Sequence, residues 1–202
     1  MSATGPSRER SRGWRSTTSG NTAGRCFPFS AAREEAAMTY RKCVFAGTFD
    51  PPTLGHKALI EDCLRLFDEV AVAVMINPDK RPFFTDAQRE EMLRLMFSDE
   101  KRIKIVFFSG TAAELLKREN TEIYVRGLRN TVDFEYENAN RFASEKLDKE
   151  ILTVYLPCPQ ELLHVSSTMV KNSLKFAAPI DEYVTKEVEA YIYAAEAEKR
   201  KG

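Results

Sequence analysis

From Arg41 onward, short apolar runs alternate along the chain with longer runs in which apolar residues recur every three or four positions. The short runs predict β-strands, and the periodic runs predict amphipathic α-helices. Strands are predicted at residues 42–46, 69–76, 103–108, 122–125 and 153–156. Helices are predicted at residues 54–67, after Thr85, and at 112–118, 131–147, 165–176 and 181–197. Strand and helix therefore alternate strictly up to the last strand.

This alternation predicts an α/β fold of the Rossmann-like, doubly wound type: a five-stranded parallel sheet with helices on both faces, followed by C-terminal helices. The run 69–76 is almost continuously apolar, as expected of a strand covered on both faces. In such sheets, ligands bind outside the carboxyl ends of the strands, near the point where strand order reverses. We therefore expect functional residues in the loops that leave the strands, at residues 47–56, 77–84, 109–111, 126–130 and 157–167.

The first of these loops, residues 47–56, reads Gly-Thr-Phe-Asp-Pro-Pro-Thr-Leu-Gly-His. It leads into a predicted helix, whose amino end presents unpaired N–H groups and a partial positive charge, so the loop predicts a phosphate site. His56 would add a donor at the same place. A bare Gly-x-x-His is more typical of an ordinary strand-to-helix turn, and it is the full ten-residue run that favours phosphate binding.

Three further loops carry residues that suit phosphate groups. Prolines flank Lys80 and limit its loop, which favours an ammonium group held over the sheet edge, although a solvated lysine accounts for the same pattern. Arg126 and Arg129 follow the fourth strand, and guanidinium pairs bind phosphoryl groups bidentately. Residues 165–171 place consecutive hydroxyls before an apolar helical run, a pattern that indicates equally a helix cap and a phosphate-binding helix start.

The composition narrows the class of protein. Thirty basic and thirty acidic residues give a formal net charge of zero, which removes any general argument for binding nucleic acid or an anionic membrane. No run of eighteen apolar residues occurs, so we expect a soluble protein of the cytoplasm. The four cysteines show no Cys-x-x-Cys spacing, and only two histidines accompany them, so we expect neither a metal held by the protein nor a disulfide framework.

Residues 1–37 differ in kind from the rest of the chain. They are rich in serine, threonine and glycine, show no apolar periodicity, and carry five arginines against one acid within residues 1–32. They predict a disordered N-terminal extension, with residues 38–202 as the folded domain. An organelle transit peptide, a disordered tail and translated sequence upstream of a true start at Met38 all fit this composition.

Four motifs in the folded region resemble the nucleotidylyltransferases with a (Thr/His)-x-Gly-His motif, and within them the bacterial-type phosphopantetheine adenylyltransferase family. The resemblance spans residues 41–195, so that 38–202 would be a nucleotidylyltransferase domain. Each motif alone is weakly specific, whereas their order and spacing together are strongly specific. The motifs are residues 47–51 with Thr53-x-Gly55-His56, Lys80-x-Pro82-x-Phe84-Thr85 with Arg89, residues 126–129 with 133–137, and residues 165–168 with Val170-Lys171.

The resemblance implies transfer of the adenylyl group of ATP to 4′-phosphopantetheine, giving dephospho-coenzyme A and pyrophosphate in coenzyme A biosynthesis. The acceptor phosphate is already a nucleophile, so such a reaction needs in-line placement and charge stabilisation rather than a covalent enzyme intermediate. The same resemblance implies Mg²⁺ bound with ATP, a homohexamer, and feedback by coenzyme A.

The resemblance also implies roles for individual residues. His56, Lys80 and Arg129 are expected to be catalytic. The residues expected to contact phosphopantetheine are Thr48, Lys80, Ala112 and Arg126. The residues expected to contact ATP are Thr48, Phe49, His56, Gly127, Leu128, Arg129, Glu137, Leu162, Leu163, His164, Val165, Ser166, Ser167 and Thr168.

Two stretches depart from the family's pattern. Residues 162–164 read Leu-Leu-His where the family often has an aromatic residue, which leaves a stacking role there open. Residues 138–141 read Asn-Ala-Asn-Arg in place of an apolar continuation, on a helix that often contributes to subunit packing in the family's hexamers.

Three other functions compete with this interpretation. A mononucleotide adenylyltransferase of NAD synthesis usually has His-x-Gly-His, where this chain has Thr53, and usually lacks the Arg-Gly-Leu-Arg run. A cytidylyltransferase is disfavoured for the same reasons. A catalytically silent nucleotide or coenzyme A sensor belongs to a different class, and the presence of His56, Lys80 and Arg129 argues against it.

Overall fold

A computed structural model describes residues 41–77 and 81–199. The predicted N-terminal extension, residues 1–37, lies outside the described residues, and so does Lys80. Within the described ranges, no helix is both long and apolar enough to cross a membrane.

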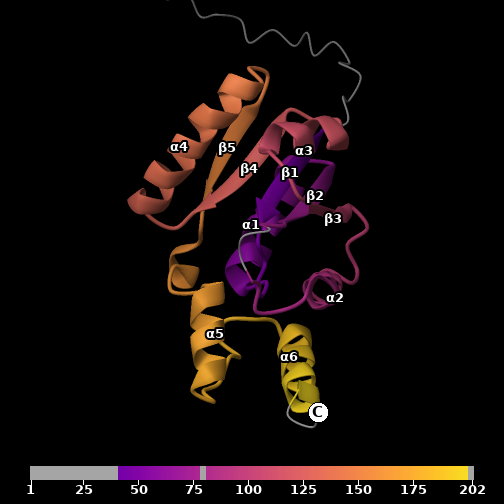
Figure 1. The fold of residues 1–202 in the computed structure, drawn as a ribbon, viewed down its shortest axis with the longest axis vertical. Helices are drawn as coiled ribbons and strands as arrows, with labels where there is room; N and C mark the ends of the chain where they lie inside the picture. The colour runs from indigo at the N-terminus through magenta and orange to yellow at the C-terminus, as the bar shows by residue number, and fades with distance from the viewer. Residues whose placement is uncertain (1–40, 78–80, 200–202) are drawn as a thin grey trace, which may run out of the picture. The chain divides into compact units, whose positions relative to one another are not determined.

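The described residues form a five-stranded parallel sheet in the order β3-β2-β1-β4-β5, which confirms the predicted fold class. β1 pairs with β2 on one side and with β4 on the other, so strand order reverses between β1 and β4 (Figure 1). The carboxyl ends of these two strands therefore flank the expected binding position. The strands are β1 (Lys42–Gly47), β2 (Glu69–Met75), β3 (Ile103–Phe108), β4 (Ile123–Leu128) and β5 (Leu152–Pro157).

Helices follow the strands where the apolar periodicity predicts them. Three of them begin with a capping box, in which a threonine hydroxyl and the side chain three residues later satisfy backbone N–H groups: Thr53 with His56, Thr85 with Gln88, and Thr111 with Glu114. The helices are α1 (Leu54–Leu66), α2 (Asp86–Met96), α3 (Ala112–Glu119), α4 (Thr131–Leu147), the 3-10 helix η1 (Gln160–Leu162), α5 (Ser167–Lys175) and α6 (Lys186–Lys199).

Apolar side chains pack on both faces of the sheet. On one face, residues of β1, β2 and β4 form a buried cluster with α1, including Phe45, Val72 and Ile60. On the other face, alternate residues of the same strands pack with α3, including Leu115 and Leu116. Because β1 and β2 are buried on both faces, the edge at which they end is held firmly.

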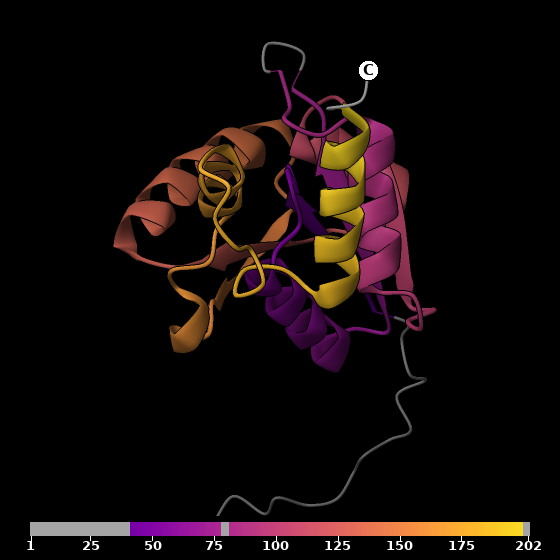
Figure 2. The same cartoon turned by 90° about the horizontal axis from the view of Figure 1, so that it is seen from below.

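A third buried cluster joins α2, α5 and α6. Figure 2 shows α6 beside α2, and Val188 and Ile192 of α6 are fully buried together with Met92 of α2. The segment before α6 also reaches α1, since the backbone N–H of Leu54 donates to the carbonyl of Tyr183 at 2.9 Å. The C-terminal helices therefore fix the entry of α1.

Two predicted boundaries differ from the structure by three residues or more. β4 continues through Arg126, Gly127 and Leu128, which the sequence assigned to a loop, because these residues pair with β5 as far as Leu128 opposite Pro157. A Cβ on Gly127 would lie 2.2 Å from a terminal methyl of Leu59, so any larger residue would force the Leu59 side chain to move.

The last helix begins at Lys186, five residues later than predicted. The Tyr183 carbonyl is used by the Leu54 N–H, and the Thr185 hydroxyl accepts from the backbone N–H of Val188 at 3.4 Å. The helix therefore begins after Thr185 rather than at 181.

Candidate active site

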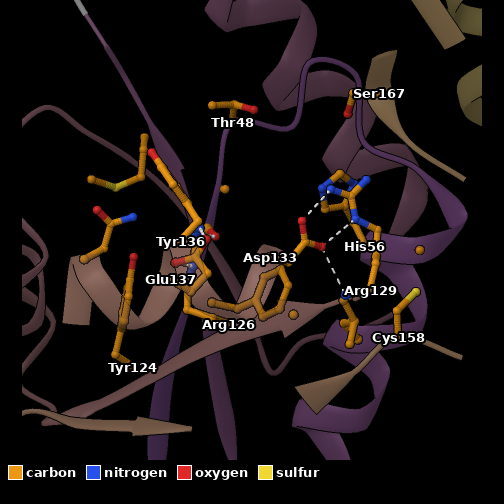
Figure 3. A pocket seen from close by; sticks show the side chains of 18 of the residues that line it. Thr48, His56, Tyr124, Arg126, Arg129, Asp133, Tyr136, Glu137, Cys158 and Ser167 are labelled. Atoms are coloured by element: carbon orange, nitrogen blue, oxygen red, sulfur yellow. Dashed lines mark hydrogen bonds and ion pairs between the residues drawn. The ribbon is translucent and has the colours of Figure 1, made fainter. Parts of the chain in front are cut away.

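A cavity of about 780 Å³ lies at the carboxyl ends of β1 and β4. The loop after β1, the first turns of α1 and α5, the start of α3, and one face of α4 line it. Figure 3 shows His56, Arg129, Asp133 and Cys158 toward one side and Tyr124, Arg126, Tyr136 and Glu137 toward the other. We call the first side the phosphate end of the cavity.

The capping box of α1 sets the orientation of His56. The backbone N–H of Thr53 donates to His56 Nδ1 at 3.1 Å, and the Thr53 hydroxyl lies 2.9 Å from the same nitrogen. A backbone N–H can only donate, so Nδ1 accepts and the proton of the neutral ring is on Nε2. The ring therefore has an N–H donor available for a ligand in the cavity.

His56 is neutral at physiological pH. Burial, together with the repulsion of a charged ring by the neighbouring Arg129 and Arg126, lowers its pKa to about 4. Its ring also lies against Phe49, with centroids 4.9 Å apart. His56 can therefore donate a hydrogen bond to an anionic group as a neutral imidazole.

The loop that carries Thr48 is held from α2. The buried Arg89 donates from Nη1 to the Thr48 carbonyl at 2.8 Å and from Nη2 to Asp86 at 2.6 Å. Phe49 adopts φ 48° and is fully buried, and a Cβ on Gly47 would lie only 3.1 Å from the Phe49 ring. Glycine at position 47 thus accommodates a strained, well-packed turn.

Asp50 connects the same loop to two other segments. Its carboxylate accepts from the backbone N–H groups of Phe83 and Phe84, both at 2.9 Å, and lies 3.5 Å from the Lys171 ammonium of α5. The Ser167 hydroxyl donates to the Pro51 carbonyl at 2.8 Å. The phosphate end is therefore assembled from segments that are far apart in the sequence.

Arg126 within β4 and Arg129 just after it are each paired with an acid of α4. Arg126 donates to both carboxylate oxygens of Glu137, with Nε to Oε2 at 2.8 Å. Arg129 donates through Nε to Asp133 at 2.9 Å. Bidentate pairing fixes the guanidinium planes, and each group retains further N–H donors for a ligand.

The start of α5 supplies hydroxyl and amide groups. The Ser166 side chain caps the helix by accepting from the backbone N–H of Met169 at 3.2 Å, and Ser166, Ser167 and Thr168 all line the cavity. Both sequence interpretations of this motif are thus compatible with the structure, since a cap and cavity-lining groups occur together. A helix N-terminus in this position favours an anion.

Comparisons with known proteins place the chain in a family. Residues 44–173 match the cytidylyltransferase-like family model. The chain is 42% identical over 135 residues to the phosphopantetheine adenylyltransferase of Neisseria meningitidis serogroup C, covering 66% of this chain and 79% of that protein. It is 33% identical over 158 residues to that of Natranaerobius thermophilus, covering 78% of this chain and 98% of that protein.

The chain belongs to the phosphopantetheine adenylyltransferase family. Among solved structures, it is similar to Plasmodium falciparum nicotinic acid mononucleotide adenylyltransferase complexed with NaAD, with a TM-score of 0.56 and 18% identity over 76% of this chain and 95% of that one. This second likeness supports the fold alone.

The cavity brings together most of the site residues that the sequence predicts. Phe49 and Leu128 do not line it, and neither do Leu162, Leu163 and His164 of the η1 segment. Leu163 is 42% exposed, and the His164 ring lies against Tyr183 instead. The predicted residues that line it are Thr48, His56, Ala112, Arg126, Gly127, Arg129, Glu137, Val165, Ser166, Ser167 and Thr168.

Sequence reasoning missed several lining residues. Asp133, Tyr136, Asn140 and Ser144 recur at helical spacing on α4, so a search for a polar helix face would have found them. Tyr124 and Thr153 stand opposite each other on β4 and β5, and Cys158 directly follows β5. Their place in the cavity depends on strand pairing, for which the sequence gives no register.

Proposed function

We propose that this protein transfers the adenylyl group of ATP to 4′-phosphopantetheine, giving dephospho-coenzyme A and pyrophosphate. The observation that carries the proposal is the convergence of Thr48, His56, Arg129 and the start of α5 in one cavity, in a chain of the phosphopantetheine adenylyltransferase family. Neutral and cationic donors gathered at one sheet edge suit a triphosphate and a phosphomonoester together.

The chemistry is a single in-line displacement. An oxygen of the acceptor phosphate forms a bond to the α-phosphorus of ATP, the bond between that phosphorus and the α,β-bridging oxygen breaks, and pyrophosphate leaves with the electron pair. The cavity contains one thiol, Cys158, and burial raises its pKa, so it is a poor nucleophile. The protein's task is positioning and charge stabilisation.

We assign the individual roles from the family and, for the described residues, also from the geometry; the role of Lys80 rests on the family alone. His56 donates from Nε2 to the transferring phosphoryl group, and Arg129 with Ser166, Ser167 and Thr168 holds the β- and γ-phosphates. Thr48 and Lys80 hold the acceptor phosphate, with Arg126 and Ala112 beside the pantetheine chain. The family implies Gly127, Leu128 and Glu137 on the nucleotide side, and of these Gly127 and Glu137 line the cavity.

ATP enters this reaction as its Mg²⁺ complex. Among residues 41–77 and 81–199, no three His, Cys, Asp or Glu side chains are grouped closely enough to hold a metal ion. Mg²⁺ commonly keeps several waters and binds through substrate phosphates, so a site with few acidic groups suits it when ATP brings it.

The test is pyrophosphate release from MgATP with four acceptor conditions: phosphopantetheine, nicotinate mononucleotide, nicotinamide mononucleotide and no acceptor. We expect release with phosphopantetheine at least about a hundredfold faster than with either mononucleotide. A substrate that leaves polar groups of the site unpaired loses at least this much in kcat/KM. Faster release with a mononucleotide would assign the chain to NAD synthesis. No release under any condition would favour the silent sensor.

The homohexamer and feedback inhibition by coenzyme A belong to the same proposal, as does a cytoplasmic location. Large apolar side chains on α4 and β5 are exposed, including Val132, Phe142, Leu147 and Leu152, which supports contact with other copies of the chain. Light scattering on the purified protein measures the subunit number, and a monomer at micromolar concentration contradicts the hexamer.

A further inference from the structure

The cavity continues beyond the phosphate end along one face of α4. Asp133, Glu137, Asn140, Arg141 and Ser144 all line it, and their spacing of three or four residues puts them on the same side of the helix. With a rise of 1.5 Å per residue, the eight steps from Asp133 to Arg141 span roughly 12 Å. The cavity therefore has room for a substrate tail that runs along α4 away from the phosphates.

Residues of the sheet line the part of the cavity that runs along α4. Tyr124 of β4 pairs in register with Thr153 of β5, and both side chains line the cavity. We define the tail end of the cavity as Tyr124, Asn140, Arg141, Ser144 and Thr153. Every one of these side chains is polar, although a substrate tail made of methylene groups would be better matched by apolar residues.

Donors outnumber acceptors at the tail end. Arg141 donates through Nε to Glu145 at 2.5 Å, and its two terminal nitrogens have no acceptor among the described residues. The side-chain amide of Asn140 and the hydroxyl of Thr153 also have no protein partner within the described part of the chain. Ser144 donates its hydroxyl to the Asn140 carbonyl at 3.1 Å and keeps its lone pairs. A guanidinium with unused N–H groups beside an amide suits a carboxylate.

We propose that the tail end of the cavity binds a carboxylate, so that the enzyme also adenylylates phosphomonoesters whose tail ends in a carboxylate, with Arg141 as the residue that determines this specificity. The inference rests on the proposed function. A fitting acceptor is 4′-phosphopantothenate, whose extended chain from phosphorus to carboxylate has about nine bonds and spans roughly 11 Å with standard bond lengths.

The chemical step is unchanged with such an acceptor. Its phosphate oxygen forms the bond to the α-phosphorus of ATP, the bond to the α,β-bridging oxygen breaks, and pyrophosphate leaves. The carboxylate takes no part in bond making, and Arg141 acts by binding it. Removing Arg141 should therefore raise KM for the carboxylate acceptor and leave kcat close to its original value.

The test compares kcat/KM for 4′-phosphopantothenate and for 4′-phosphopantetheine in the full-length wild-type protein and in Arg141→Met. We expect the wild type to use both acceptors, with values within about a hundredfold of each other. In Arg141→Met, the ratio of the phosphopantothenate value to the phosphopantetheine value should fall about tenfold, as expected for loss of one partly solvated charge-assisted contact. Asn140→Leu should lower the same ratio about threefold.

Arg94→Met is the matched control, because Arg94 also pairs with a glutamate four residues away, Glu90, on a helix face outside the cavity. It should leave the ratio unchanged. The inference is overturned if the wild type uses phosphopantetheine but not phosphopantothenate, or if Arg141→Met lowers both values equally; the proposed function stands in either case. If the wild type uses neither acceptor, the proposed function itself fails.

Discussion

Two walls of the cavity differ in how firmly the fold holds them. At the phosphate end, Thr53 is 1% exposed and orients His56, while the buried Arg89 holds the Thr48 carbonyl and Asp50 binds two backbone N–H groups. The opposite wall is α4, a helix of 17 residues with none buried. One wall is part of the core, and the other lies over the sheet with much of its surface exposed.

This difference separates two requirements of the reaction. Stabilising the charge on a transferring phosphoryl group needs donors that are fixed before the substrate arrives, and burial in a packed core fixes them. Binding a substrate tail tolerates exchange of side chains on a helix surface, because such changes cost the fold little. We therefore expect substitutions at the buried wall to act on turnover and stability, and substitutions on α4 to act on acceptor choice.

The largest effect on turnover should come from substituting His56 in the buried wall. His56→Ala removes the Nε2 donor, so kcat should fall by roughly 10²- to 10³-fold, as for loss of one preorganised donor. The variant also loses half of a capping box, which should cost about 1 kcal/mol of unfolding free energy. Steady-state kinetics and urea denaturation measure the two effects.

Gln88→Ala is the control for the His56 variant. Gln88 accepts from the Thr85 backbone N–H at 3.0 Å in the capping box of α2, so its loss should lower stability by a similar amount without changing kcat. An unchanged kcat in His56→Ala, or an equal loss of kcat in Gln88→Ala, would contradict the catalytic role of His56.

Arg89→Met should give the next largest effect, because it leaves the Thr48 carbonyl without its buried donor. We expect the unfolding free energy to fall by about 2 to 3 kcal/mol. Turnover should fall as well, since the Thr48 loop loses its anchor. The control is Arg94→Met, since Arg94 lies on the exposed face of the same helix, and it should change neither quantity. Denaturation curves that shift equally for both variants would contradict the distinction between buried and exposed arginines.

The pH dependence of the unfolding free energy also tests whether His56 belongs to the buried wall, with a smaller expected effect. The pKa of His56 is lowered to about 4 in the folded protein, so between that value and about 6.5 the unfolded chain binds more protons. The stability from the neutral ring is therefore fully present above pH 6.5 and is lost as pH falls toward 4. We expect a loss of about 2 kcal/mol, reduced from the fully buried limit because the ring is partly open to the cavity.

The measurement is the difference in unfolding free energy between the wild type and His56→Ala at each pH, which cancels the contribution of the carboxylates. This difference should be constant from pH 6.5 to 8 and shrink below 6.5. Across the upper range kcat should also be flat, because the ring stays neutral. A difference that grows as the pH falls would show that the folded protein prefers a charged ring.

Arg129→Met tests the boundary between the two walls and should have the smallest effect. Arg129 is exposed and paired with Asp133 of α4, so it combines a fixed orientation with access to solvent. We expect KM for ATP to rise about tenfold, equivalent to about 1.4 kcal/mol, with a smaller change in KM for the acceptor. Product-inhibition and initial-rate kinetics separate the two constants, and a rise confined to the acceptor would move Arg129 to the other substrate.

The sequence predicted the fold well because apolar periodicity records burial directly. The strand Ile103–Phe108 has the predicted bounds. The helix Thr131–Leu147 has them too, although none of its residues is buried. The errors lie where a distant segment decides the boundary. The pairing of β4 with β5 draws Arg126 into the strand, and the bond from Leu54 to the Tyr183 carbonyl delays the last helix.

The site was predicted in part for the same reason. Loop position and residue type were enough for Thr48, His56 and Arg129, because the topology gathers strand ends at one edge. The support from Arg89 and Asp50 depends on hydrogen bonds across 41 and 34 residues of sequence, which no local pattern encodes. The tail end of the cavity was missed because it needs the register of β4 on β5.

The stereochemistry at the α-phosphorus tests most directly whether the adenylyl group passes from ATP to the acceptor without a covalent enzyme intermediate. ATP made chiral at that phosphorus is turned over with phosphopantetheine, and the configuration of the dephospho-coenzyme A product is determined. A single in-line attack by the acceptor phosphate predicts inversion. Retention would show two successive displacements through an adenylylated residue and would contradict the account; Cys158 is a thiol among the described residues that line the cavity.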